Sequence, residues 1–227
     1  MDITCINSDY YEVTNLDCRN LHASQYVVFD VEATGIDWRE ERVTQIGAVR
    51  VGGPLTEIRE EFSTYVNPMR VIPPRIQNLT GISQSAVTKA PTFREAILEF
   101  GEFCADYPLV TQAGYEFDIP LLREECRRTK CGELGGTVLD TKVIYRALHP
   151  EVQKIPSTDF LCEVYQIDRS QFQRHDALGD ARLTARMLMA LLAEAKALGV
   201  EDIVVCKPLR VPRSKTPAIP DVEYCLK

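Results

Sequence analysis

The sequence predicts an α/β domain of three layers, in which helices flank a mixed central sheet. Two observations support this fold class. Three β-rich segments follow one another with short connections early in the chain, which indicates an antiparallel meander. Helical and strand segments then alternate, which predicts parallel strands that are connected through helices.

The meander is expected over residues 26–32, 42–51 and 59–66, which are rich in β-branched and aromatic residues. Turn-forming residues follow each of these segments, such as Gly53 and Pro54 after the second. The short connections between the three segments favour pairing between neighbours along the chain.

Helical periodicity starts near Thr92, which forms the pattern of a capping box with Glu95. Apolar residues then recur every three to four positions, which predicts a helix over residues 93–106. Ser157 is expected to cap a later helix, and Gly199 is expected to end the last one. The other expected elements are strands over 109–112 and 137–140, and helices over 119–129, 141–148, 158–165 and 176–198.

Three parts are expected along the chain: an N-terminal extension over 1–24, a central domain over 25–200, and a tail over 201–227. The extension shows no clear period and is interpreted as packed on the domain or partly mobile. The tail is rich in proline, and residues 207–215 hold four basic residues and no acid, so it is expected to be extended. It either touches a nucleic-acid backbone or is a linker or strap packed on the domain.

Composition excludes several classes of protein. The chain has 227 residues, 45% of them hydrophobic, which fits one globular domain with extensions. Its apolar runs are shorter than the roughly 20 residues of a membrane helix, and its N-terminal region lacks a secretory pattern, so a cytoplasmic location is expected. The eight cysteines form no C-x-x-C pair, which favours reduced thiols. The net charge of −7 argues against a basic coat that grips duplex DNA, but not against a metal-dependent nuclease.

Two carboxylates on the first expected strand are the first candidate for chemistry. Asp30 and Glu32 are two residues apart, so both side chains leave the same face of the sheet. Two like charges that are buried on one face require a compensating cation. The alternative is a solvent-facing pair at the end of a strand.

Three further residues add to this candidate site. Asp118 opens a helix, where it is either a metal ligand or a helix N-cap. His175 and Asp180 would lie about 140° apart if both were helical, but a His175 that lies just before the helix is free to approach Asp180. An imidazole at that place suits a general base for a water molecule, and the alternative is a surface histidine.

The motifs around these residues resemble those of the DEDDh, or DnaQ-like, 3′→5′ exonucleases, which include the proofreading epsilon subunits of bacterial DNA polymerase III. Residues 29–35 read Phe-Asp-Val-Glu-Ala-Thr-Gly and resemble the first motif, F-D-x-E-T-T-G. Phe117 and Asp118 resemble the second motif, and residues 175–181 resemble the third, H-x-A-x-x-D-A. The intervening segments 79–82, 90–93 and 138–141 are also similar to those of this family.

The resemblance implies a ribonuclease H-like fold and a two-metal mechanism. Asp30, Glu32, Asp118 and Asp180 are expected to bind two Mg²⁺ or Mn²⁺ ions, and His175 is expected to deprotonate the attacking water. The expected substrate-binding residues are Ala33, Thr34 and Gly35 for the 3′ end and Leu79 and Thr80 for the base or sugar.

The implied partner is nucleic acid with a single-stranded or frayed 3′ end, and the products are nucleoside 5′-monophosphates. No membrane partner is expected. A homodimer and a polymerase or repair complex are both candidate assemblies. DNA and RNA are both candidate substrates, in proofreading, repair, RNA trimming or oligonucleotide degradation.

The sequence departs from the family pattern before the second motif, where Ala113 and Gly114 replace a frequent histidine and asparagine. This departure concerns substrate contacts and leaves the ligand aspartate in place. Ala33 stands where threonine is frequent. Asp140 is interpreted as a helix cap, and Asp176 as a solvated charge at a helix start.

Two other functional classes are compatible with these residues. One is a nucleic-acid-binding or scaffold module on the same fold. The other is a different metal phosphohydrolase, such as an endonuclease or a mononucleotide hydrolase. Single-nucleotide product steps would distinguish an exonuclease from both.

Overall fold

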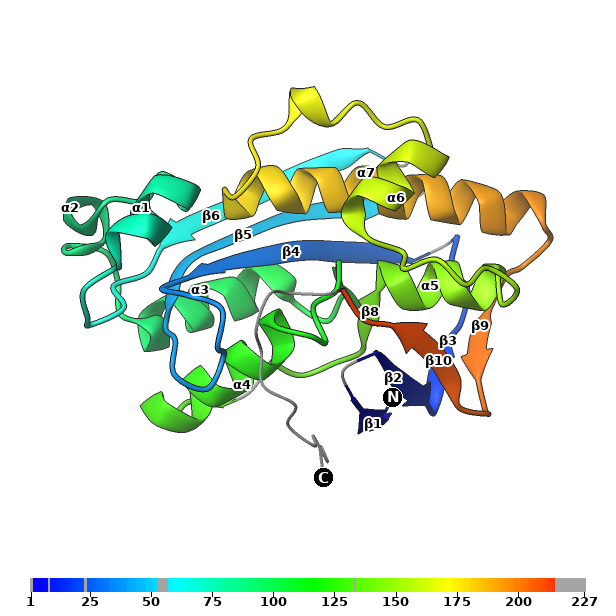
Figure 1. Cartoon of the computed structure of the whole chain (residues 1–227), viewed down its shortest axis with the longest axis horizontal. Helices are drawn as coiled ribbons and strands as arrows, with labels where there is room; N and C mark the ends of the chain where they lie inside the picture. The colour runs from blue at the N-terminus through cyan, green and yellow to red at the C-terminus, as the bar shows by residue number, and fades with distance from the viewer. Residues whose placement is uncertain (1, 8, 23, 53–56, 133, 215–227) are drawn as a thin grey trace.

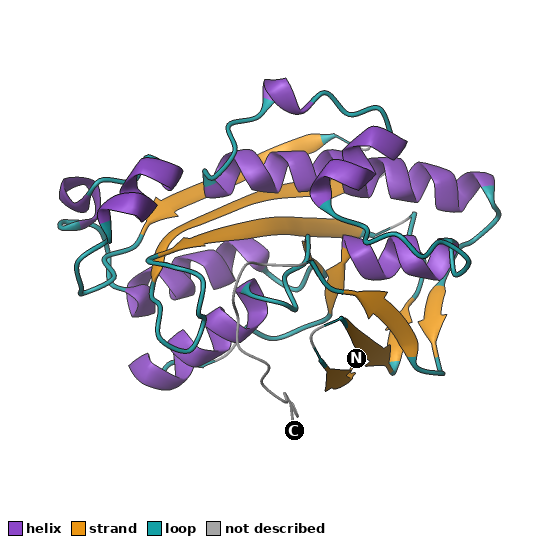
Figure 2. Ribbon diagram, viewed as in Figure 1, coloured by secondary structure: helices purple, strands orange, loops and turns teal. Residues whose placement is uncertain are grey.

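The computed structural model describes residues 2–7, 9–22, 24–52, 57–132 and 134–214. A central sheet lies between two layers of helices (Figure 1). Helix α7 covers one face, where it packs against β4 and β5, and helices α3 and α4 lie on the other (Figure 2). This arrangement confirms the predicted three-layer α/β fold.

The central sheet has the strand order β6-β5-β4-β7-β8. The first three strands pair antiparallel, and β7 and β8 continue the sheet in parallel with β4. The predicted mixed sheet is therefore confirmed. Its strands are β4 (Gln25–Ala33), β5 (Val43–Gly52), β6 (Ile58–Tyr65), β7 (Leu109–Thr111) and β8 (Val138–Asp140).

The helices follow the expected positions from residue 93 onward. The helices of the described residues are α1 (Pro74–Thr80), α2 (Gln84–Val87), α3 (Phe93–Cys104), α4 (Asp118–Thr129), α5 (Thr141–Leu148), α6 (Thr158–Val164), the 3₁₀ turn η1 (Arg169–Gln171) and α7 (Ala177–Ala197). Helices α1 and α2 were not predicted, because seven and four residues are too few to show a period. They are held together by a small apolar cluster of their own, formed by Ile72, Ile76, Ile82 and Val87.

The predicted helix ends are observed. Thr92 and Glu95 form a reciprocal capping box at the start of α3, and Ser157 caps α6 by accepting a hydrogen bond from the Phe160 backbone N–H. Gly199 adopts a φ of 70° just after α7, a conformation that glycine tolerates without strain. Local capping chemistry therefore delimits these helices.

The N-terminal extension, which showed no clear period in the sequence, is built from short strands whose side chains pack into the main core. It forms β1 (Asp2–Ile6), β2 (Tyr10–Thr14) and β3 (Leu16–Cys18). The tail supplies β9 (Ile203–Val205) and β10 (Leu209–Pro212), which confirms that this part is extended. Strand β10 pairs with β2, and β9 pairs with β3, so the two ends of the chain are joined.

The pairing of the two ends buries side chains that the sequence pattern did not identify. Tyr11, Val13, Leu16 and Leu21 are fully buried in the main core. The alternation of buried and partly buried residues in β2 spans only five residues and includes Glu12, which is too short to reveal a strand. The predicted tail residues 215–227 and the turn residues Gly53 and Pro54 lie outside the described residues.

Candidate functional site

A pocket of about 340 Å³ lies at the end of β4, where helices α4 and α7 begin. Apolar side chains from α1 and from the loop after β4 line part of it, and carboxylates line another part. The five predicted catalytic residues all line this pocket, namely Asp30, Glu32, Asp118, His175 and Asp180. The structure thus brings together residues from three distant segments of the chain.

Asp30 and Glu32 line the pocket from the C-terminal end of the central strand β4. Burial, reinforced by Asp118, Asp180 and Glu32, raises the pKa of Asp30 well above its ordinary value. Burial, together with Asp180 and Asp118, likewise raises the pKa of Glu32 to about 8. Both side chains are only partly exposed and line the pocket, which favours a site over a solvent-facing pair at the end of a strand.

Asp118 begins α4 but does not cap it. The N-cap residue is Phe117, and the Asp118 carboxylate instead accepts a hydrogen bond from the Thr111 hydroxyl at 2.9 Å. Burial is the main cause that raises the pKa of Asp118 to about 7, while this hydrogen bond lowers it. The interpretation of Asp118 as a helix cap is therefore wrong.

Thr111 also explains the glycine that departs from the family pattern. A Cβ added at Gly114 would lie 2.2 Å from the Thr111 methyl carbon. Any larger residue at this place would displace the side chain that holds Asp118. Thr111 and Gly114 are therefore a matched pair, and the asparagine frequent in the family does not fit beside Thr111.

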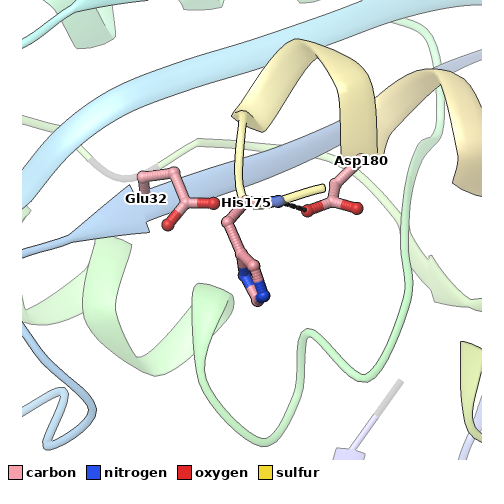
Figure 3. A group of neighbouring side chains, drawn as sticks. All are labelled: Glu32, His175 and Asp180. Carbon is pink, nitrogen blue, oxygen red and sulfur yellow. Dashed lines mark hydrogen bonds between the residues drawn. The ribbon is translucent and has the colours of Figure 1, made fainter. Parts of the chain in front are cut away.

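His175 lies just before α7, the position from which the sequence allowed it to approach Asp180. Its backbone has a φ of 59°, a left-handed conformation that is uncommon outside glycine. Its backbone N–H donates to Asp180 Oδ2 at 2.8 Å. Figure 3 shows His175 between the carboxylates of Glu32 and Asp180. The turn before α7 therefore places an exposed imidazole at the pocket.

Strand β5 holds the start of α7 against the sheet. Gly47 pairs with Asp30 across the sheet, and a Cβ at Gly47 would lie 2.2 Å from the backbone nitrogen of Leu178. The Gln45 side chain donates to Asp176 Oδ1 at 2.9 Å and accepts from the Ala177 N–H at 3.1 Å. These contacts hold the third motif, at the start of α7, close to the first motif on β4.

Asp176 and Asp140 are both helix caps. Asp176 Oδ2 accepts from the Gly179 N–H at 2.9 Å, so Asp176 is a cap bound to Gln45 and not the solvated charge that was predicted. Asp140 Oδ1 accepts from the Lys142 N–H at 2.9 Å, which confirms its predicted capping role.

The electrostatics of the pocket favour a bound cation. Arg174 is the only arginine or lysine among the described residues that line the pocket, and its Nε lies 2.6 Å from Asp180 Oδ1. Ligand atoms of Glu32, His175 and Asp180 lie within 4.8 Å of one another. Oxygen-rich, mutually repelling carboxylates of this kind match the donor set that Mg²⁺ and Mn²⁺ prefer.

The predicted substrate-binding residues do not all reach the pocket. Ala33, Gly35, Leu79 and Thr80 line it, but Thr34 does not appear among its described lining residues. The Thr34 hydroxyl donates to Glu41 and accepts from the Arg42 N–H at 3.0 Å, so it stabilises the loop after β4. The Thr80 hydroxyl bonds within its own turn, to Ile76 O at 3.0 Å.

Several pocket residues were missed from the sequence. The pocket is also lined by Gln112, Glu116, Thr158, Arg174 and Ser214. Arg174 adjoins the third motif and Glu116 adjoins the second, and this proximity was the available signal for both. Gln112, Thr158 and Ser214 lie in contexts where no local pattern indicates a site.

Comparisons with known proteins agree with this geometry. The chain is 34% identical over 175 residues to the DNA polymerase III subunit epsilon of Aquifex aeolicus, which covers 77% of this chain and 84% of that protein. It is 30% identical over 179 residues to the PolC-type DNA polymerase III of Caldanaerobacter subterraneus, which covers 79% of this chain. The chain spans only 12% of the length of that PolC relative.

Solved structures show the same fold at low sequence identity. The nuclease domain of 3′hExo, described as a DEDDh family member bound to rAMP, has a TM-score of 0.68 at 18% identity and covers 76% of this chain and 94% of that chain. A full-length 3′-exonuclease has a TM-score of 0.68 at 17% identity and covers 96% of this chain and 77% of that chain. In the described part of this chain, no helix is long and apolar enough to span a bilayer.

A family model described as exonuclease, of the RNase T type, matches residues 27–188. This range contains all five predicted catalytic residues and the predicted DnaQ-like DEDDh motifs. The chain therefore belongs to the RNase T exonuclease family.

Proposed function

We propose that this chain is a metal-dependent 3′→5′ exonuclease that releases nucleoside 5′-monophosphates from DNA or RNA. The observation that carries the proposal is the convergence of four carboxylates and a histidine in one pocket of a chain from an exonuclease family. The relatives, one named a DNA polymerase III subunit epsilon and one a PolC-type DNA polymerase III, motivate the choice of a nucleic-acid substrate.

Asp30, Glu32, Asp118 and Asp180 would hold two Mg²⁺ or Mn²⁺ ions. The raised pKa values of Asp30, Glu32 and Asp118 support this assignment, because they arise from burial and from the neighbouring carboxylates, and a bound cation would offset both effects. Bound divalent ions would lower the pKa of water and stabilise the charge of the phosphodiester transition state. Binding would also release Asp180 from Arg174.

His175 would take the proton from the attacking water. The backbone N–H of His175 is hydrogen-bonded to Asp180, so the imidazole ring can rotate at the edge of the pocket without moving the Asp180 carboxylate. Its exposure gives the abstracted proton a path to solvent. Proton transfer by a positioned histidine accelerates such reactions by about 10²–10⁴-fold.

The shape of the pocket supports binding of a single terminal nucleotide. Its volume of about 340 Å³ lies near the lower end of the range for small-ligand sites, roughly 300–1,000 Å³. Ile36 and Leu79 offer exposed apolar contacts for a base, and the backbone at Ala33 and Gly35 faces the same pocket. Single-stranded or frayed 3′ ends fit this arrangement better than a closed duplex.

The relatives motivate a proposal for the biological setting. We propose a cytosolic enzyme and a polymerase or repair complex as its partner, since one relative is named a polymerase III subunit. DNA is the first substrate to test, with RNA of the same sequence beside it.

The decisive experiment measures hydrolysis of a 5′-labelled single strand with Mg²⁺ or Mn²⁺. The wild-type protein should produce a ladder of single-nucleotide steps, and Asp30→Ala should abolish it without lowering the melting temperature. A circular strand should stay intact. Equal rates for wild type and Asp30→Ala, or cleavage of the circle, would refute the proposal.

A further inference from the structure

The C-terminal segment reaches the pocket although it lies beyond the range of the family match. Ser214 lines the pocket, whereas the match ends at residue 188. Strand β10 leads to it and is held along its length by β2. The Arg213 N–H extends this pairing with a hydrogen bond to Asp9 O at 2.9 Å. The segment is therefore anchored up to the residue before Ser214.

A buried ion pair holds Ser214 in place. The Lys142 side chain is 0% exposed, and its ammonium group pairs with Glu116, whose side chain is 9% exposed. Ser214 joins the pair twice: its N–H donates to Glu116 Oε2 at 3.1 Å, and its hydroxyl accepts from Lys142 Nζ at 3.3 Å. We call Glu116, Lys142 and Ser214 the latch. Burying two charges is costly without such additional hydrogen bonds, so the tail segment completes the pair.

The latch adds the polar groups of Glu116 and Ser214 to the wall of the pocket. Ala113, which lines the pocket, has no polar side chain. The Gln112 amide is already engaged with Thr141 and with Pro156 O. The Ser214 hydroxyl accepts from Lys142 and keeps its own hydrogen for donation.

We propose that the latch makes the C-terminal segment a fixed wall of the nucleotide pocket, and that Ser214 is a specificity-determining residue that hydrogen-bonds the 3′-terminal nucleoside. Lys142 is a positioning residue that acts through Glu116 and Ser214. This inference rests on the proposed exonuclease function. It assigns the terminal nucleoside, and not the reacting phosphate, to this wall.

The first test is the binding of AMP and dAMP, the expected products, to the full-length protein by calorimetry in Mn²⁺. Ser214→Ala removes one hydroxyl and should raise Kd about 3–10-fold, the worth of one hydrogen bond. On an oligonucleotide, KM should rise similarly while kcat stays within about twofold. A loss confined to AMP would assign Ser214 to the 2′-hydroxyl, and equal losses would assign it to the base or 3′-hydroxyl.

The matched control is Ser170→Ala, because Ser170 is exposed on η1 and bonds to Asp168 away from the pocket. This variant should bind both nucleotides as the wild type does. Unchanged Kd and KM in Ser214→Ala, with normal wild-type binding, would refute the proposed role of Ser214 in nucleotide binding. The exonuclease function would not be affected by that result. A wild type that neither binds nor hydrolyses would overturn both.

The second test separates the positioning role from a purely structural one. Lys142→Met leaves Glu116 unpaired and should raise Kd more than Ser214→Ala does, with kcat again little changed. Adding Glu116→Gln removes the uncompensated charge and should return Kd to the level of Ser214→Ala. A folded Lys142→Met protein with unchanged Kd would refute the latch, and if this variant does not fold, the Ser214→Ala result decides.

Discussion

Two buried acidic groups on the same helix behave in opposite ways. Asp118 and Glu125 both belong to α4 and are 6% and 0% exposed. Glu125 lies 2.6 Å from Arg42 and 3.0 Å from Arg128, so two guanidinium groups compensate its charge. Asp118 is hydrogen-bonded to the neutral Thr111 hydroxyl and faces Asp30 and Asp180.

The difference separates structural from functional carboxylates. Around Glu125 the chain carries its own cations, and these tie α4 to the loop that follows β4 through Arg128 and Glu41 O. Around Asp118 the described residues offer too little positive charge, and burial raises the pKa of Asp118 to about 7. A site whose carboxylates repel one another when ionised is suited to a bound cation. This expectation can be tested at Asp118 and at Glu125.

The largest expected effect is on activity at the uncompensated end of α4. Asp118→Asn removes a metal ligand and should reduce hydrolysis by about 10³-fold, since a metal supplies several kcal/mol of transition-state stabilisation. Its melting temperature without metal should equal or exceed that of the wild type, because a repulsive charge is lost. Mn²⁺ should raise the melting temperature of the wild type more than that of the variant. A clear loss of stability in Asp118→Asn would contradict this comparison.

The compensated group should show the reverse pattern. Glu125→Ala removes the buried carboxylate that pairs with Arg42 and Arg128, so we expect a loss of about 3 kcal/mol in the free energy of unfolding. At roughly 2–4 °C per kcal/mol, the melting temperature should fall by about 6–12 °C. The folded fraction should keep its Mn²⁺ response. Glu99→Ala, on the exposed face of α3, is the control and should melt like the wild type.

The pH dependence of the metal-free protein should report the same imbalance. A carboxyl whose pKa is higher in the folded than in the unfolded chain binds its proton more tightly when folded, so stability falls as the pH rises between the two values. For Glu32 the folded value is about 8 and for Asp118 about 7, against ordinary values near 4. In EDTA the melting temperature should decline from pH 5 to pH 8, and the decline should be shallower in Glu32→Gln. An equal slope in the two proteins would argue against a strained acid at this position.

The smallest effect is expected from the neutral partner of Asp118. Thr111→Val keeps the shape of the side chain but removes its hydroxyl, so hydrolysis should fall about 2–10-fold, as expected for one hydrogen bond. The hydrogen bond from Thr111 lowers the pKa of Asp118, so Mn²⁺ binding in the variant should require a higher pH. Thr111→Ser restores the hydroxyl and should recover activity, and failure of this rescue would assign Thr111 to packing alone.

The outcome for Asp118 shows where prediction from sequence succeeded and where it stopped. Its local context favoured a helix cap, and only its order with Asp30 and His175 indicated a metal site. The helix indeed begins at Asp118, yet the side chain turns toward Thr111 and not toward the helix backbone. Local propensity located the element, but the direction of the carboxylate depends on a neighbouring strand.

The sequence by itself determined the mixed sheet, most of its helices with their caps, and the five candidate residues that the structure gathers in one pocket. These features are encoded in contiguous periods and motifs, which short-range chemistry makes readable. Tertiary structure alone decided that the two ends of the chain pair through β2 and β10, and that Ser214 reaches the pocket through Lys142 and Glu116. Such contacts join residues that are distant in sequence. They depend on the closure of long loops, so no local sequence pattern indicates them.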